Sequence, residues 1–173
     1  MNKKNSLYFA SKPIQYFNIT NIEDSNNKDL LLISYFKDAE SLAKRAQASG
    51  YWNSVQIFED YKSAFSSIEI DKFDKVFIDS DYGLSKFLFL RKFKNSIISV
   101  YEEGIGTYSN HLRSSINLNF KKTSLFSQII SLLITKVYSI MGNYDYHGGS
   151  KYTNQIIVYN PEEYLKGKDL KNK

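Results

Sequence analysis

Short apolar runs alternate with stretches of helical character along most of the chain. Some of these runs are apolar at nearly every position, as at residues 30–33 and 97–100, which is typical of strands covered on both faces of a sheet. Their length and their content of β-branched and aromatic residues predict strands rather than helices. Six strands are predicted, at residues 7–10, 30–35, 54–58, 75–79, 97–101 and 155–159.

Three of the intervening stretches predict helices, at residues 13–22, 38–49 and 85–93. Pro13 is tolerated in a first helical turn, Asp38 is a candidate cap, and Gly50 is a stop signal. The alternation predicts an α/β domain over residues 1–160, Rossmann-like and doubly wound, with a mostly parallel sheet. Ligands of such sheets bind at the carboxyl ends of the strands.

Two segments depart from this pattern. Residues 125–141 are apolar almost all round, but they fall short of the ~20 apolar residues that a membrane-spanning helix needs. Such a segment is either a helix buried between domains or against a partner, or a helix lying in a membrane interface beside Lys121 and Lys122. Residues 161–173 are polar and lysine-rich, which predicts a frayed tail or the start of an interdomain linker.

Composition narrows the classes of function. The chain has no cysteine, which excludes disulfides, thiol nucleophiles and thiolate metal sites and fits the reducing cytoplasm. The apolar stretch at residues 7–10 is too short for the core of a signal peptide. The formal net charge is +5, but the basic residues are scattered along the chain, so no nucleic-acid partner is predicted.

The sharpest chemical feature is a pair of acids at the end of a predicted buried strand. Glu102 and Glu103 follow residues 97–101 and precede Gly104 and Gly106, and glycines allow the backbone to approach a ligand closely. Neighbouring carboxylates repel each other, so one of the two tends to have a raised pKa, as a general base that works near neutral pH requires. An equal alternative is that the two acids only terminate the strand and cap the next segment. The residues alone leave both interpretations open.

Three other features are weaker. Asp79, Ser80 and Asp81 offer oxygen ligands for a cation, but a turn or a helix cap is the favoured interpretation. His147 precedes two glycines, but the chain has neither a P-loop nor a GxGxxG motif, so a loop histidine is favoured over a phosphate site. Ser11 and Lys12 follow the first strand, where an acceptor or a nucleotide would bind.

Three motifs carry a family resemblance. Residues 7–17 contain a turn with a small residue, Pro, an apolar residue and Gln; residues 101–108 contain the acid-acid-Gly run; and residues 148–151 lead into the apolar run before Pro161. In this order they resemble the N-terminal half of bacterial sialyltransferases and polysialyltransferases, which build capsule and lipooligosaccharide. The resemblance covers nearly the whole chain, although each motif is short.

The resemblance implies a GT-B fold, in which two Rossmann-like domains face a cleft. It implies an inverting transfer from a nucleotide-activated sugar, typically CMP-sialic acid, to a glycan acceptor, with no metal and no other cofactor. The acid-acid-Gly motif maps onto Glu102, Glu103 and Gly104, and Glu103, next to the glycine, is favoured as the general base with Glu102 as its neighbour. The candidate substrate-binding residues are Gly104, Gly106 and Thr107 after one strand and Ser11, Lys12 and Gln15 after another.

One departure from the family is serious. Those enzymes carry a His-Pro motif in a C-terminal domain, where the histidine contacts the donor phosphate, and here His111 precedes Leu112 while His147 precedes Gly148. The sequence therefore predicts an acceptor-side domain whose donor-binding partner domain is missing, with little transferase activity alone. It is expected in the cytoplasm, and peripheral contact with the inner face of the bacterial membrane is left open. The rival hypothesis is a non-catalytic α/β scaffold module that docks through residues 125–141.

Overall fold

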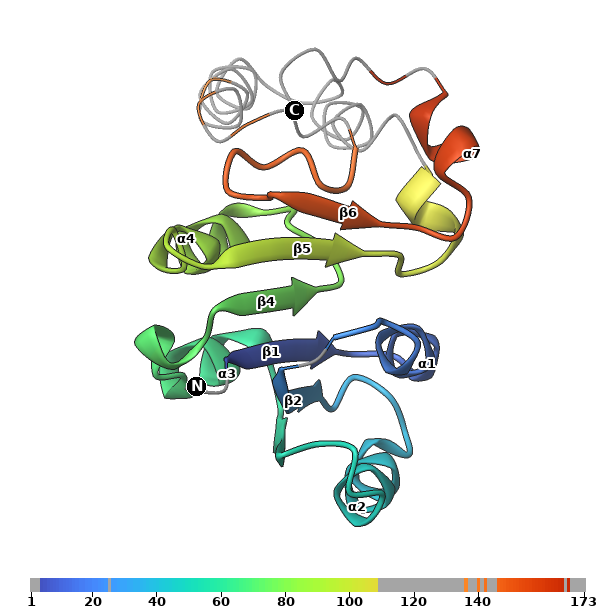
Figure 1. Cartoon of the computed structure of the whole chain (residues 1–173), viewed down its shortest axis with the longest axis vertical. Helices are drawn as coiled ribbons and strands as arrows, with labels where there is room; N and C mark the ends of the chain where they lie inside the picture. The colour runs from blue at the N-terminus through green and yellow to red at the C-terminus, as the bar shows by residue number, and fades with distance from the viewer. Residues whose placement is uncertain are drawn as a thin grey trace, which may run out of the picture.

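The fold is built on one parallel sheet. The computed structural model describes residues 4–24, 26–108 and 146–166, together with the single positions 136, 140, 142 and 168. Within them, every pair of neighbouring strands is parallel, and the strand order is β3-β2-β1-β4-β5-β6 (Figure 1). The predicted Rossmann-like, doubly wound α/β class is confirmed. The strands are β1 (Asn5–Ala10), β2 (Asn27–Ile33), β3 (Ser54–Phe58), β4 (Lys75–Ile78), β5 (Ile97–Tyr101) and β6 (Gln155–Ile157).

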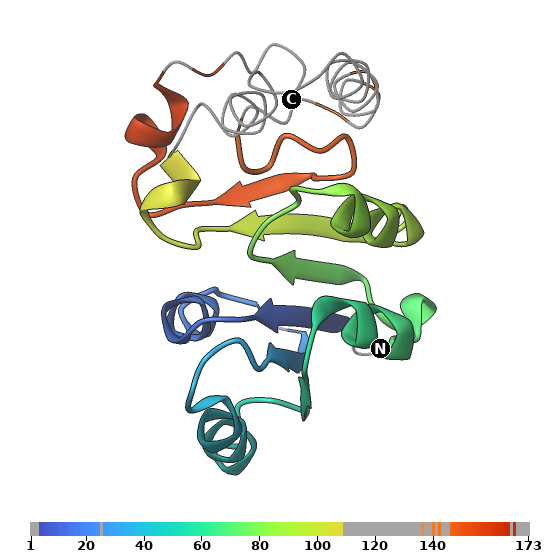
Figure 2. The same cartoon turned by 180° about the vertical axis from the view of Figure 1, so that it is seen from behind.

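Helices cover both faces of the sheet, as the two opposite views show (Figures 1 and 2). The three predicted helices are present, with ends within two residues of those expected. The sequence pattern did not reveal α3 or the short elements. The helices are α1 (Pro13–Thr20), α2 (Ala39–Ala48), α3 (Tyr61–Ser67), α4 (Leu84–Lys92) and α7 (Pro161–Leu165), with 3-10 turns η1 (Ile70–Lys72) and η2 (Ile105–Tyr108).

Successive residues of the central strand supply two aromatic cores. On one face, the ring of Tyr8 stacks on Phe77 with centroids 4.3 Å apart and meets Trp52 edge-on at 5.3 Å. On the other face, Phe9 packs edge-on against Phe89 at 5.5 Å. Alternate residues of a strand point to opposite faces. Both faces are therefore apolar, which explains why the strand sequences read as continuous apolar runs.

The strand order places the switch point of the sheet between two particular strands. The chain runs outward from β1 through β2 to β3, then crosses back to β4 on the other side of β1 and continues to β5 and β6. In sheets of this order, ligands bind outside the carboxyl ends of the strands where the winding reverses. Here that switch point lies between Ala10 at the end of β1 and Ile78 at the end of β4.

The structure differs in part from two local expectations. The turn expected at residues 79–81 is present, since Ser80 Oγ accepts a hydrogen bond from the Tyr82 N–H at 3.2 Å. Asp81 does not cap the helix after it, because α4 has Gly83 at its N-cap position, with φ of +97° and no side-chain capping bond. The polar tail does not fray from Pro161, because residues 161–165 form α7, where Asn160 caps the helix by accepting a hydrogen bond from Glu163 N–H and Tyr164 is buried. In both places, parts of the chain farther away supply the partners of Asp81 and Tyr164.

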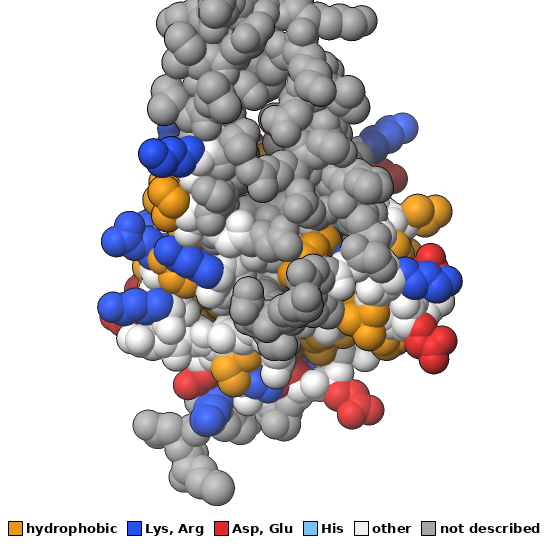
Figure 3. Space-filling model, turned by 90° about the horizontal axis from the view of Figure 1, so that it is seen from above, with side chains coloured by type: hydrophobic (Ala, Val, Ile, Leu, Met, Phe, Trp, Pro, Cys, Tyr) orange, Lys and Arg blue, Asp and Glu red, His pale blue; other side chains and the backbone are white. Residues whose placement is uncertain are grey.

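The apolar segment 125–141 lies outside the described residues, apart from Lys136 and Ile140. Across the part of the chain that is described, no helix is both long and apolar enough to cross a membrane. On the face drawn in Figure 3, several Lys and Arg side chains of the described residues gather along the left side with hydrophobic ones between them, and others stand beside acidic side chains.

Candidate active site

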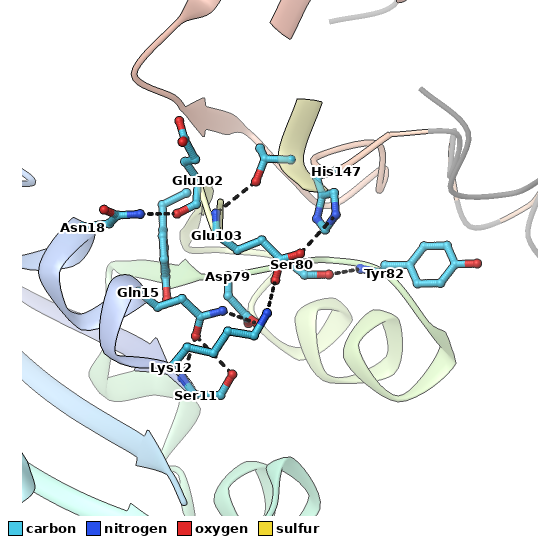
Figure 4. A network of polar contacts seen from close by, with 12 residues as sticks. Ser11, Lys12, Gln15, Asn18, Asp79, Ser80, Tyr82, Glu102, Glu103 and His147 are labelled. Atoms are coloured by element: carbon cyan, nitrogen blue, oxygen red, sulfur yellow. Dashed lines mark hydrogen bonds and ion pairs between the residues drawn. The ribbon is translucent and has the colours of Figure 1, made fainter. Parts of the chain in front are cut away.

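A buried hydrogen-bond network lies at the switch point, between the ends of β1 and β4. The Gln15 side chain donates to Asp79 Oδ2 at 3.3 Å and accepts from the backbone N–H of Ser11 at 2.6 Å (Figure 4). The Ser11 hydroxyl also lies 3.1 Å from the same Gln15 oxygen. All three side chains are buried. The network therefore ties the turn after β1 to the end of β4, and Ser11 and Gln15 form its interior.

The negative charge of Asp79 has a cationic partner and a hydrogen-bond donor inside the protein. Lys86 Nζ lies 3.0 Å from Asp79 Oδ1, and the Tyr61 hydroxyl donates to the same oxygen at 2.7 Å. Burial and the neighbouring Asp79 carboxylate raise the pKa of Tyr61, so its hydroxyl stays protonated as a donor. Among the described residues, no group of three or more His, Cys, Asp or Glu side chains is arranged to hold a metal ion. Asp79 therefore acts as a hub of structural contacts.

Glu103 lies above this network, where three strand ends meet. Its side chain is 20% exposed, and its two oxygens face different basic groups. Lys12 Nζ lies 3.4 Å from Oε2, and His147 Nε2 lies 3.5 Å from Oε1 (Figure 4). Lys12 follows β1, Glu103 follows β5 and His147 precedes β6. The fold thus brings together a partly exposed carboxylate and two nitrogen groups from distant parts of the sequence.

The turn after β5 directs the Glu103 side chain. The backbone N–H of Glu103 donates to Thr107 Oγ1 at 3.0 Å, and the Thr107 N–H donates to the Gly104 carbonyl at 3.0 Å. Gly104 has φ of +134°, a conformation that favours glycine. A Cβ added to Gly106 would lie 3.5 Å from Glu103 Oε1. The two glycines and Thr107, predicted as substrate-binding residues, thus shape the turn around the Glu103 carboxylate.

Glu102 is used differently from its neighbour. Its carboxylate accepts hydrogen bonds from the Tyr108 hydroxyl and from the backbone N–H of Tyr159, the latter at 2.9 Å. Its carbonyl accepts from Asn18 Nδ2 at 2.7 Å. Burial and the hydrogen bond to Glu102 raise the pKa of Tyr108. The Glu102 carboxylate therefore joins η2 to the chain after β6, and Figure 4 shows the two glutamates pointing in different directions.

Hydrogen bonds to Asp81 hold the loop that carries His147 beside Glu103. The Asp81 side chain is fully buried, and it accepts hydrogen bonds from Gly148 N–H at 2.9 Å, Ser150 N–H at 2.7 Å and the Thr153 hydroxyl at 2.7 Å. These bonds fold the loop after His147 around one carboxylate. The sequence singled out Asp81 and the two glycines after His147 separately, but no local signal joins residues 67 or more positions apart.

A cavity of about 180 Å³ lies beside Glu102, between the end of α1 and the ends of β5 and β6. Tyr101, Tyr159 and Ile157 give it apolar walls, and Asn18 contributes a polar amide. The Tyr159 hydroxyl donates to Asn18 Oδ1 at 3.2 Å, and Tyr159 as a whole is 62% exposed. The exposed ring of Tyr159 and the amide of Asn18 thus offer one apolar and one polar surface to a small molecule.

Comparisons with known proteins do not assign the chain to a family. No family model matches the sequence, and no curated protein matches it. The resemblance to sialyltransferases therefore stays a prediction from three short motifs. A functional proposal has to rest on the geometry around Glu103.

Proposed function

We propose that this chain is the acceptor-side domain of a sialyltransferase-like glycosyltransferase in which Glu103 is the general base. The observation that supports the proposal best is the position of Glu103. Its carboxylate is partly exposed at the carboxyl edge of a doubly wound sheet, beside the switch point, and nitrogen groups lie 3.4 and 3.5 Å from its two oxygens. A general base needs this combination of access and fixed orientation.

The reaction uses Glu103 for one proton. As an acceptor hydroxyl oxygen bonds to the sugar carbon of the donor, its proton passes to the Glu103 carboxylate. The bond between that carbon and the phosphate oxygen breaks, and its electron pair leaves with the nucleotide. Positioned general bases contribute roughly 10²- to 10⁴-fold to such a rate. Lys12 Nζ lies 3.4 Å from Glu103, on a side chain that is 55% exposed. It places a positive charge at the same edge of the sheet.

The proposal includes the partners of the reaction. The donor is CMP-sialic acid, and the acceptor is a surface glycan that reaches Glu103 past the cavity beside Glu102. As the family resemblance implies, the proposed enzyme includes a donor-binding domain with a His-Pro motif. The reaction takes place in the cytoplasm, at the inner face of the bacterial membrane.

Turnover of CMP-sialic acid by the complete gene product tests this proposal. Release of CMP is measured with a sialylated oligosaccharide as acceptor, for the wild type and for Glu103→Gln, Glu102→Gln and Glu162→Gln. We expect Glu103→Gln to lose about 100-fold or more in kcat, as removal of a general base does. We expect Glu102→Gln to retain at least about a tenth of kcat, since its carboxylate serves folding contacts.

Glu162→Gln is the matched control, because this exposed glutamate of α7 undergoes the same chemical change. Equal activity of Glu103→Gln and Glu162→Gln would contradict the proposal. Association of the wild type with a membrane or a partner that survives Glu103→Gln, without CMP release by any variant, would favour the scaffold hypothesis instead.

A further inference from the structure

His147 is a buried side chain with an unsatisfied ring nitrogen. Its side chain is only 6% exposed, and Nε2 lies 3.5 Å from Glu103 Oε1. The other ring nitrogen, Nδ1, is buried and has no hydrogen-bond partner in the described parts of the chain. Buried polar atoms nearly always have a partner. Since Nδ1 has no partner, the contact between Nε2 and Glu103 is the polar interaction that explains the orientation of the ring.

The contact with Glu103 favours one of the two neutral tautomers of the ring. With the proton on Nδ1, a buried donor would have no acceptor, and the Nε2 lone pair would face a carboxylate oxygen. With the proton on Nε2, the ring donates toward Glu103 Oε1 and only an acceptor is left unpaired. The 3.5 Å separation is long for a hydrogen bond, as is common at catalytic sites without substrate.

The charged groups around the ring favour its neutral form. Burial lowers the pKa of His147, and the carboxylates of Glu103, Asp81 and Asp79 oppose this shift, while the ammonium of Lys86 adds to it. These groups follow β5 and β4 and lie on α4, the elements that surround the ring. The shift of the His147 pKa is downward overall, which favours the neutral imidazole.

The position of the ring is fixed by Asp81. The backbone N–H of Gly148, directly after His147, donates to Asp81 Oδ1, and Ser150 N–H donates to Oδ2. On the other side, the Tyr164 hydroxyl of α7 donates to the His147 carbonyl. The residue that carries the ring is thus held from β4 and from α7, and the imidazole has little freedom to leave Glu103.

We infer that His147 is a positioning residue for the general base: its neutral imidazole donates the Nε2 proton to Glu103 Oε1, and Asp81 holds the loop that carries it. This inference rests on the proposed role of Glu103. Lys12 constrains the second oxygen of the carboxylate, so both oxygens are oriented before an acceptor arrives. A base held in this way is ready for transfer without reorganisation.

Nuclear magnetic resonance of the 173-residue chain tests the inference without reference to activity. The chain has two histidines, His111 and His147, so a His111→Gln variant assigns the imidazole ¹⁵N signals. We expect His147 to be the Nε2–H tautomer at pH 7, with a titration midpoint below that of an ordinary histidine. The Nδ1–H tautomer, or a cationic ring at pH 7, would overturn the inference.

Two further variants test the partners of the ring. Glu103→Gln removes a negative charge that favours the cation, so we expect the pKa of His147 to fall further. Asp81→Asn removes the acceptor for the loop, and we expect the His147 signals to shift or broaden while circular dichroism shows a folded chain. A His147 titration unchanged by Glu103→Gln, or signals unchanged by Asp81→Asn, would contradict the corresponding contact.

Kinetics of the complete gene product separate positioning from packing. His147→Leu should lower kcat roughly 10- to 100-fold with little change in KM, since a displaced base slows the chemical step. The acidic limb of its pH profile should move to higher pH, because a carboxylate without its donor is protonated more easily. His147→Gln should recover part of kcat, since its side-chain amide replaces the Nε2 donor.

Kinetics distinguish failure of His147 as a positioning residue from failure of Glu103 as the general base. Wild-type kinetics for His147→Leu, in an enzyme that Glu103→Gln inactivates, would overturn the positioning role while the base stands. Full turnover by Glu103→Gln would overturn the base and with it the catalytic part of the inference, whatever tautomer the ring adopts.

Discussion

At the scale of single residues, two adjacent glutamates have different tasks. The Glu102 carboxylate accepts hydrogen bonds from the Tyr108 hydroxyl and the Tyr159 N–H, while the Glu103 carboxylate faces Lys12 and His147 across longer distances. Both residues follow Tyr101, the last residue of β5, and the turn in which the Glu103 N–H donates to Thr107 Oγ1 directs the Glu103 carboxylate away from that of Glu102. The pair is therefore one structural carboxylate and one candidate base rather than a dyad that shares a proton.

This division predicts different effects on stability. Glu102→Gln should lower the free energy of unfolding by about 1–2 kcal/mol, because it weakens two hydrogen bonds to a charged acceptor in a partly exposed position. Glu103→Gln should cost less than about 1 kcal/mol, because it loses a long and partly screened ion pair. Urea denaturation with a common m-value measures both. A larger loss for Glu103→Gln than for Glu102→Gln would show that the assignment is reversed.

At the scale of elements, the loop after His147 depends on one glycine. Gly148 has φ of +82°, and a Cβ at this position would lie 2.5 Å from two side-chain carbons of Ile156 in β6. The loop therefore meets β6 on one side and the Asp81 carboxylate on the other. Substitution of this glycine should displace the loop and the imidazole with it.

Gly148→Ala and Gly50→Ala separate conformational cost from steric cost. Gly50 has φ of +68° with no atom within 4 Å of an added Cβ, so its alanine variant should lose about 1–2 kcal/mol from backbone conformation alone. Gly148→Ala should lose roughly 1–3 kcal/mol more, from the clash with Ile156. Thermal or urea unfolding compares the two variants. Equal losses would mean that the loop relaxes away from β6 at no cost.

The same elements show how much the sequence could predict. The six strands followed from short runs rich in apolar, β-branched and aromatic residues, and the inner ones are nearly continuous because the sheet is covered on both faces there. The α3 helix was missed because it is short, although Asp60 and Ser63 form its cap. Lys12 and Glu103 were predicted from their places after strands, whereas the role of Asp81 was not, since the donors to its carboxylate lie 67 to 72 residues away.

At the scale of the whole molecule, the strand order concentrates the chemistry at one edge. Lys12 after β1, Asp79 and Asp81 after β4, and Glu103 after β5 all lie at the carboxyl ends of their strands. The opposite edge carries structural pairs instead, such as Lys72 with Asp29. Since ligands of doubly wound sheets bind at this edge, these residues are the candidates for a ligand site.

The central claim is that a glycan binds at the carboxyl edge beside Glu103. The most direct measurement is a titration of the ¹⁵N-labelled chain with a sialylated oligosaccharide, monitored through the backbone amide signals. We expect shifts at Lys12, in the turn from Glu103 to Thr107, at His147 with its neighbouring loop, and at Asn18 and Tyr159 beside the cavity. Absence of binding, or shifts confined to the edge around Asp29 and Lys72, would contradict it.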